Sequence, residues 1–184
     1  MSDVAEPAEP HGHLTLVLGG TRSGKSAVAE RLASRTGGAV TYVATARVDP
    51  ADADHVARIE RHRARRPAHW TAVEAPDPAG LADLLAGLAG PVLLDSLGTW
   101  VAGHTDLVVD PRPLADALRS RRSPTIVVSE EVGWSLHAPT AVGRRFVDAV
   151  GETNQAVAAL ADTVLLVVAG RVLALPPAEA PPTC

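Results

Sequence analysis

The sequence predicts an α/β domain in which helices cover both faces of a mostly parallel sheet. Short apolar runs alternate with helix-like stretches along the chain, and most of the runs are apolar at every position. Strands of that kind are typical of parallel sheets whose two faces are both buried. The 184 residues, of which 46% are hydrophobic, suffice for one such domain with a substantial core. We assign the domain to residues 14–175, with flexible Pro- and Ala-rich tails at 1–13 and 176–184.

The strands and helices are expected to alternate as in β–α–β units, which place a binding site at the carboxyl ends of the strands. After the last long strand, Ala169 and Gly170 can turn the chain into RVLAL, residues 171–175, as an antiparallel edge strand. The expected long strands are 14–18, 40–44, 91–95, 125–129 and 163–168. The expected helices lie near 25–35, 50–65, 79–88, 112–121 and 140–161.

Charge and cysteine content limit the classes of function. The net charge is −4 and the isoelectric point is about 5.9, whereas a domain that binds nucleic acid is normally basic. The single cysteine, Cys184, excludes an intrachain disulfide framework and a cysteine metal cluster, and it favours a reducing cytoplasm. No apolar run reaches membrane-spanning length, and residues 1–13 lack the pattern of a signal peptide.

A glycine-rich turn follows the first expected strand and leads into the helix-favouring run AVAERLA. Its spacing is G-x-x-x-x-G-K-S, and the strand, turn and helix together are the context of a P-loop, although a plain glycine turn is the alternative. In a P-loop, backbone N–H groups surround phosphate oxygens, the lysine reaches the terminal phosphates and the serine binds Mg²⁺. The predicted nucleotide-binding residues are Gly19, Gly20, Thr21, Arg22, Ser23, Gly24, Lys25 and Ser26.

Asp95 closes the expected strand 91–95 with a carboxylate. An acid at the carboxyl end of a buried strand faces the P-loop in this fold, so we expect Asp95 and Ser26 as the ligands of Mg²⁺. An aspartate that caps a strand-to-loop turn is the alternative.

The stretch RIERHRARRPAHW, residues 58–70, holds five arginines and two histidines in a chain whose net charge is negative. Asp49 and Pro50 predict the start of a helix that runs to Arg65, with Arg58 and His62 on one face. A histidine among arginines stays largely neutral and is a good nucleophile toward a phosphoryl group. Taken alone, however, the pattern favours a solvated helix face.

Several motifs occur together in one order: GGTRSGKS, TYVATA (41–46), RIERHRARRPAHW followed by TAVEAP, LLDSLGTW (93–100), VVSEEVGW (127–134), and the helix and strand of 143–170. In this combination the chain resembles the bifunctional adenosylcobinamide kinase / adenosylcobinamide-phosphate guanylyltransferase family of cobalamin biosynthesis. The resemblance spans nearly the whole domain and is far more specific than a P-loop alone.

The resemblance implies two reactions and a RecA-like P-loop core. ATP or GTP phosphorylates the hydroxyl of adenosylcobinamide, and GMP is then transferred from GTP to that phosphate through a GMP–histidine adduct. His62 matches the histidine, and Lys25 is the P-loop lysine. The resemblance also implies Mg²⁺, a corrinoid substrate and a homotrimer. The positions that it matches to nucleotide contacts are Ala44, Thr45, Ala46, Arg58, Arg66, Glu74 and Asp95.

Two departures from the family pattern concern the kinase step or the choice of substrate more than the nucleotide site. Glu130 stands where the family has Asn, and the bulky Trp134 follows in a loop that is one residue longer. The segment before His62 lacks the usual acidic pair.

Two other functions remain open from the residues: a P-loop small-molecule kinase without nucleotidyl transfer, and a RecA-type nucleic-acid module, which the acidic balance disfavours.

Overall fold

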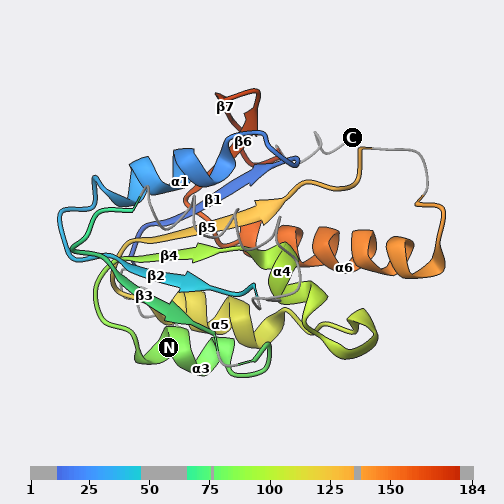
Figure 1. Ribbon diagram of the computed structural model, residues 1–184, viewed down its shortest axis with the longest axis horizontal. Coiled ribbons are helices and arrows are strands. Elements are labelled where there is room, and N and C mark those ends of the chain that lie inside the picture. Colours follow the sequence, from blue (N-terminus) through green and yellow to red (C-terminus); the bar gives the residue numbers. More distant parts are fainter. Residues whose placement is uncertain (1–11, 47–65, 76, 135–137, 179–184) are drawn as a thin grey trace, which may run out of the picture.

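The computed structural model describes residues 12–46, 66–75, 77–134 and 138–178, whose strands form a seven-stranded sheet (Figure 1). The strand order is β3-β2-β4-β5-β1-β6-β7. Every neighbouring pair is parallel except β6 and β7, which are antiparallel. The predicted α/β class and the antiparallel edge strand at 171–175 are therefore confirmed.

The strands confirm the expected runs and add one at the edge. β3 was not expected because its four residues, TAVE, are mostly exposed and form no continuous apolar run. It pairs only with β2, which is enough to hold it at the sheet edge. The strands are β1 (Leu14–Gly19), β2 (Thr41–Ala44), β3 (Thr71–Glu74), β4 (Val92–Asp95), β5 (Thr125–Glu130), β6 (Thr163–Val168) and β7 (Arg171–Ala174).

The helices likewise match the expected stretches, with one addition. The short helix α4, which was not expected from the sequence, follows β4 directly and begins with a capping box between Ser96 and Thr99. The helix expected at 50–65 lies outside the described residues. The described helices are α1 (Lys25–Ala33), α3 (Leu81–Gly87), α4 (Leu97–Ala102), α5 (Arg112–Ser120) and α6 (Ala141–Ala158), with a 3₁₀ turn, η1 (Thr105–Leu107).

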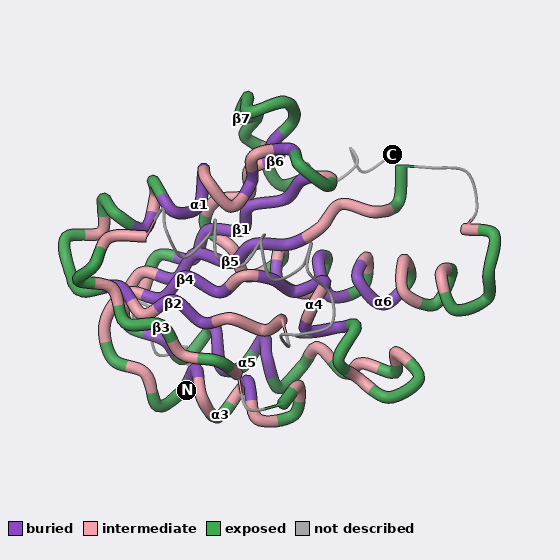
Figure 2. Tube along the Cα trace, in the orientation of Figure 1, coloured by how far each residue is buried: buried purple, intermediate pink, exposed green. Residues whose placement is uncertain are grey.

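Alternate residues of the strands face two separate apolar cores, so the sheet is covered on both faces (Figure 2). On one face, α1 packs through Val28 and Ala29 against Val17 and Ile126. On the other face, α3, α4, α5 and α6 pack against strand residues such as Leu16 and Leu94. Burial of both faces explains why the central strands read as continuous apolar runs.

A buried arginine ties the loops at the amino ends of the strands. Arg121 is 5% exposed, and its guanidinium donates hydrogen bonds to the carbonyls of Leu85, Leu88 and Gly90 and to the Thr125 hydroxyl, at 2.6–2.8 Å. Burial lowers the pKa of Arg121 from its usual value. This arginine therefore has a structural role away from the carboxyl edge.

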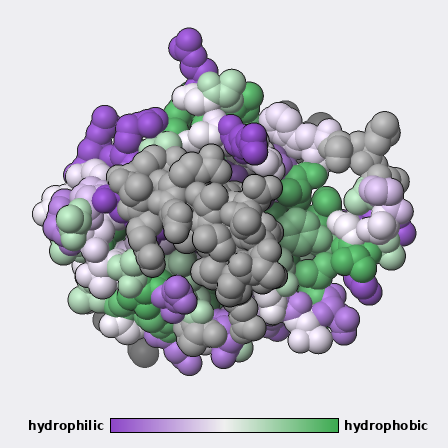
Figure 3. Space-filling model, viewed as in Figure 1, coloured by the Kyte–Doolittle hydropathy of each residue, from purple (hydrophilic) through white to green (hydrophobic). Residues whose placement is uncertain are grey.

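The parallel strands bring their carboxyl ends to one edge of the sheet, where Gly19 of β1 pairs with Glu130 of β5. Beside that edge, toward which the arrows of Figure 1 point, Figure 3 shows a group of hydrophobic side chains on an otherwise mixed surface.

None of the described helices has the length and hydropathy of a membrane span. Residues 12 and 13, expected in the tail, are bonded to the domain, since the Gly12 amide donates to Arg121 O and His13 O accepts from the Thr125 amide.

Candidate functional site

The P-loop connects β1 to α1 through a turn in which two positions, Gly19 and Gly24, favour glycine. A Cβ on Gly19 would lie 2.5 Å from the Ser23 hydroxyl oxygen and 2.7 Å from the Val167 carbonyl oxygen. Gly24 has a φ of 96°, a left-handed conformation that favours glycine, and it precedes the first residue of α1. The predicted motif is therefore confirmed as a strand–turn–helix unit whose helix N-terminus faces the turn.

Lys25 reaches back over this turn from the start of α1. Its Nζ donates a hydrogen bond of 3.4 Å to the carbonyl of Gly20, and the residue is only 5% exposed. The Ser23 carbonyl accepts from the Gly170 amide at 2.8 Å, which ties the P-loop to the β6–β7 turn. Lys25 is thus held within the loop, at the place where P-loop lysines reach the terminal phosphates.

Glu130 was singled out in the sequence only as a departure from the family pattern, and it proves to be part of the P-loop site. Its Oε1 lies 3.6 Å from Nζ of Lys25. The next amide, that of Glu131, donates to the carbonyl of Gly19 at 3.1 Å, so the end of β5 is fixed against the P-loop. The signal that could have found it is the one used for Asp95, an acid at the carboxyl end of a buried strand.

Asp95 lies at the end of β4, and β5 separates that strand from β1. The hydroxyl of Tyr42 donates a hydrogen bond of 3.2 Å to Oδ2 of Asp95. Burial, followed by the charge of Asp95, raises the pKa of Tyr42 above its usual value. The guanidinium carbon of Arg66 lies over the face of the same ring, 3.5 Å from its centroid. Tyr42 therefore joins Arg66 to Asp95.

Thr45 continues β2 into a hydroxyl network with the start of α4. Its Oγ1 accepts a hydrogen bond of 2.9 Å from the amide of Ser96 and donates one of 2.6 Å to the carbonyl of Ser96. The Thr99 hydroxyl lies 2.6 Å from the Thr45 hydroxyl and 3.2 Å from the Ser96 hydroxyl. Because each hydroxyl has a single proton, it can donate only one of these hydrogen bonds at a time. The network fixes the end of β2 against the turn that carries Asp95.

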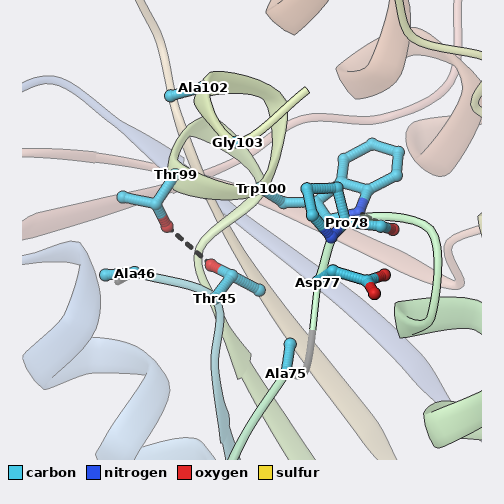
Figure 4. A pocket seen from close by; sticks show the side chains of 9 residues that line it. All are labelled: Thr45, Ala46, Ala75, Asp77, Pro78, Thr99, Trp100, Ala102 and Gly103. Carbon is cyan, nitrogen blue, oxygen red and sulfur yellow. Dashed lines mark hydrogen bonds between the residues drawn. The ribbon is translucent and has the colours of Figure 1, made fainter. Parts of the chain in front are cut away.

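A pocket of about 250 Å³ opens beside this network (Figure 4). The Thr45 and Thr99 side chains lie on one side of it, and the Trp100 ring and Pro78 lie on another. The Trp100 indole donates to the carbonyl of Pro78 at 2.8 Å and the residue is 4% exposed, so it belongs to the core as well as to the pocket wall. The lining residues are Thr45, Ala46, Ala75, Asp77, Pro78, Thr99, Trp100, Ala102 and Gly103.

The donors predicted for Mg²⁺ are the Ser26 hydroxyl, at the start of α1, and the Asp95 carboxylate, at the end of β4. No group of three or more His, Cys, Asp or Glu side chains that could hold a metal ion occurs among the described residues. Mg²⁺ commonly takes one or two protein oxygens and completes its shell with substrate phosphates and water. The hydroxyl and the carboxylate at this edge fit that mode of binding.

The remaining predicted site residues divide into two groups. Glu74 ends β3 and is exposed, next to Ala75 of the pocket, and Ala44 ends β2 beside Asp95. His62 and Arg58 lie outside the described residues, so their assignment remains a prediction. The side-chain amide of Asn154 on α6 donates to the carbonyl of Glu130 at 3.0 Å, which ties this helix to the end of β5.

Comparison with known proteins supports one family. A family model described as cobinamide kinase / cobinamide phosphate guanyltransferase matches residues 15–175. The bifunctional adenosylcobalamin biosynthesis protein CobP of Pseudomonas aeruginosa is 40% identical over 167 residues, which are 84% of this chain and 92% of the relative. The corresponding protein CobU of Salmonella typhimurium is 33% identical over 177 residues, with 85% and 96% covered. Among solved structures, the flagellar accessory protein FlaH from Methanocaldococcus jannaschii has a TM-score of 0.49 at 15% identity, covering 89% of this chain and 76% of that chain.

Proposed function

The chain belongs to the cobinamide kinase / cobinamide phosphate guanyltransferase family, and from that membership we propose how its residues divide the two reactions between them. It is a bifunctional enzyme of cobalamin biosynthesis. The first reaction phosphorylates adenosylcobinamide, and the second transfers GMP from GTP to the new phosphate. Both reactions draw on the P-loop that Gly19–Ser26 form.

In the kinase step, the acceptor hydroxyl of adenosylcobinamide attacks the γ-phosphorus of ATP or GTP. The bond from the γ-phosphorus to the bridging oxygen breaks, and the nucleoside diphosphate leaves. The P-loop amides and Lys25 hold the terminal phosphates and stabilise the charge on their oxygens. Mg²⁺, held by Ser26 and Asp95, would neutralise phosphate charge when bound.

In the guanylyl step, we assign the nucleophile to His62. Its ring nitrogen attacks the α-phosphorus of GTP, pyrophosphate leaves, and an oxygen of cobinamide phosphate then displaces the histidine. Arg58 and Arg66 would bind the phosphate charge. The residues on either side of the segment 47–65 support this assignment: Ala46 lines the pocket, and Arg66 stacks on Tyr42 of β2.

We assign the pocket beside Thr45 and Trp100 to the guanosine part of GTP. The resemblance matches Thr45 and Ala46 to a nucleotide-contacting strand end, and both line the pocket. Its aromatic and aliphatic walls suit a planar base, with a few polar groups at the rim. The homotrimer and the cytoplasmic location remain expectations from the sequence.

The observation that carries this proposal is the match over residues 15–175, which contains both the confirmed P-loop and His62. The test is incubation with α-labelled GTP and Mg²⁺, followed by denaturation. We expect a protein-bound label that is acid-labile and base-stable, as a phosphoramidate is. The label should disappear in His62→Ala and persist in His69→Ala, which replaces an exposed histidine of the same block. An unlabelled protein that still phosphorylates cobinamide would reduce the function to that of a small-molecule kinase.

A further inference from the structure

A carboxylate lies beside the lysine that the nucleotide needs. Lys25 is the only lysine of the chain, and its side chain is 6% exposed. The Glu130 side chain, 19% exposed, places Oε1 at 3.6 Å from the ammonium. A charge pair with this little solvent around it interacts more strongly than a surface pair. Glu130 is therefore the charged partner of Lys25 in the described site.

Both oxygens of Glu130 are also anchored on the far side of the site. Oε1 accepts a hydrogen bond of 2.9 Å from the Ser96 hydroxyl, and Oε2 accepts one of 2.9 Å from the Gly98 amide. A Cβ on Gly98 would collide with Oε2, so the carboxylate lies directly against the start of α4. These bonds hold Glu130 in place independently of Lys25.

With a nucleotide bound, this arrangement brings two anions, the phosphate and the Glu130 carboxylate, to one cation, the Lys25 ammonium. When the terminal phosphates bind, the Lys25 ammonium interacts with them, while Ser96 and Gly98 still hold the Glu130 carboxylate nearby. Phosphate and carboxylate repel each other at this range unless another cation intervenes. The resemblance places a neutral asparagine at position 130, so this conflict departs from the usual family pattern.

We propose that Glu130 competes with the nucleotide phosphates for Lys25, and thereby makes tight nucleotide binding depend on a divalent cation. The inference rests on the proposed function, because it assumes that the P-loop binds the nucleotide. It adds a specificity-determining residue to that site. The fold-change that it predicts concerns binding, so it is measurable without the corrinoid substrate.

The test compares charge with shape at position 130. Glu130→Gln keeps the length and an acceptor oxygen but removes the charge, whereas Glu130→Asp keeps the charge and shortens the side chain. Titration with a fluorescent ATP analogue is made with Mg²⁺ and with EDTA. In EDTA we expect Glu130→Gln to bind about tenfold more tightly than the wild type, and in Mg²⁺ the difference should shrink to less than about threefold. Glu130→Asn, the family residue, should behave as Glu130→Gln does.

A purely structural role predicts the opposite ranking. Glu130→Asp would then be the damaged variant, because it cannot reach Ser96 and Gly98 as glutamate does, and Glu130→Gln would match the wild type in EDTA. That result would overturn the proposal. Glu152→Gln makes the same charge change on an exposed position of α6 and should leave both titrations unchanged. A wild type that binds nucleotide under neither condition would instead refute the nucleotide site of the proposed function.

Discussion

The guanidinium of Arg66 stacks on the face of the Tyr42 ring, with its central carbon 3.5 Å from the ring centroid. Tyr42 belongs to β2, whereas Arg66 is the first described residue after the segment that contains His62. The contact therefore fastens one end of that segment to the sheet, and the tyrosine hydroxyl carries the connection on to Asp95. Cation–π contacts of this kind contribute up to about 2 kcal/mol when they are desolvated.

Tyr42→Phe should separate the stacking from the hydrogen bond. The ring under Arg66 remains, while Asp95 loses a donor, so we expect the free energy of unfolding to fall by about 1–2 kcal/mol. Urea unfolding at neutral pH measures this loss, and GMP labelling should persist because Arg66 keeps its contact. A loss of labelling at unchanged stability would contradict this division of roles.

The pH dependence of stability should reveal the shifted tyrosine. Burial and Asp95 raise the pKa of Tyr42 above its unfolded value of about 10. The folded protein thus holds the phenolic proton more tightly, so this stabilisation is fully present below about pH 10 and is lost as the pH rises toward the folded pKa. We expect the free energy of unfolding of the wild type to fall more steeply above about pH 10 than that of Tyr42→Phe. Tyr42 is the only tyrosine, so tyrosinate absorbance reports its ionisation directly.

Arg121→Met should destabilise the fold without acting on the site. Three carbonyls and one hydroxyl lose their donor, and we expect the free energy of unfolding to fall by about 3 kcal/mol or more. Arg119→Met is the matched control, since Arg119 is exposed and pairs only with Asp116 in the described contacts. Its effect should stay within about 0.5 kcal/mol. Equal losses in chemical denaturation would disprove the structural role of Arg121.

Lys25→Met should remove the kinase activity while the fold persists. Methionine fills the buried space of the lysine stem but cannot stabilise charge on the terminal phosphates, so kcat for cobinamide phosphorylation should fall by about 10²–10³-fold. The rate is measured by product formation, and circular dichroism verifies the fold. A variant with near wild-type kcat would exclude Lys25 from the phosphoryl transfer.

Ala75→Leu should narrow the pocket beside Trp100. If the guanosine part of GTP binds there, the added methyl groups should raise KM for GTP in the labelling reaction by about tenfold, with a smaller effect on the limiting rate. Ala158→Leu on α6 is a substitution of the same size outside the pocket. An unchanged KM in Ala75→Leu would move the guanosine site elsewhere.

The sequence predicts the fold well because its strongest signals are local. The run Leu14–Gly19 followed by Gly24 and Lys25 predicts a strand, a turn and a helix, and the structure confirms all three. β3 escaped prediction because an exposed four-residue edge strand depends on its neighbour rather than on its own pattern. The helix α4 escaped because six residues are too few for a helical period.

Site residues that belong to a sequence motif were predicted, whereas those whose role depends on a contact between distant elements were missed. The P-loop follows from spacing alone, but nothing near Glu130 in sequence announces Lys25, which lies on another element. The same holds for Tyr42, whose contacts with Arg66 and Asp95 depend on strand order. His62 and Arg58 rest on the family pattern, outside the described residues.

The strand order also bears on how such an enzyme can diverge. Because β5 lies between β1 and β4, the end of β5 adjoins both halves of the site while belonging to neither motif. Two strand spacings, about 10 Å, separate the P-loop strand from the strand of Asp95. A single codon at position 130 can therefore change the charge between the two halves while both motifs stay intact. A substitution at this position thus alters the electrostatics between the two motifs without rebuilding the fold.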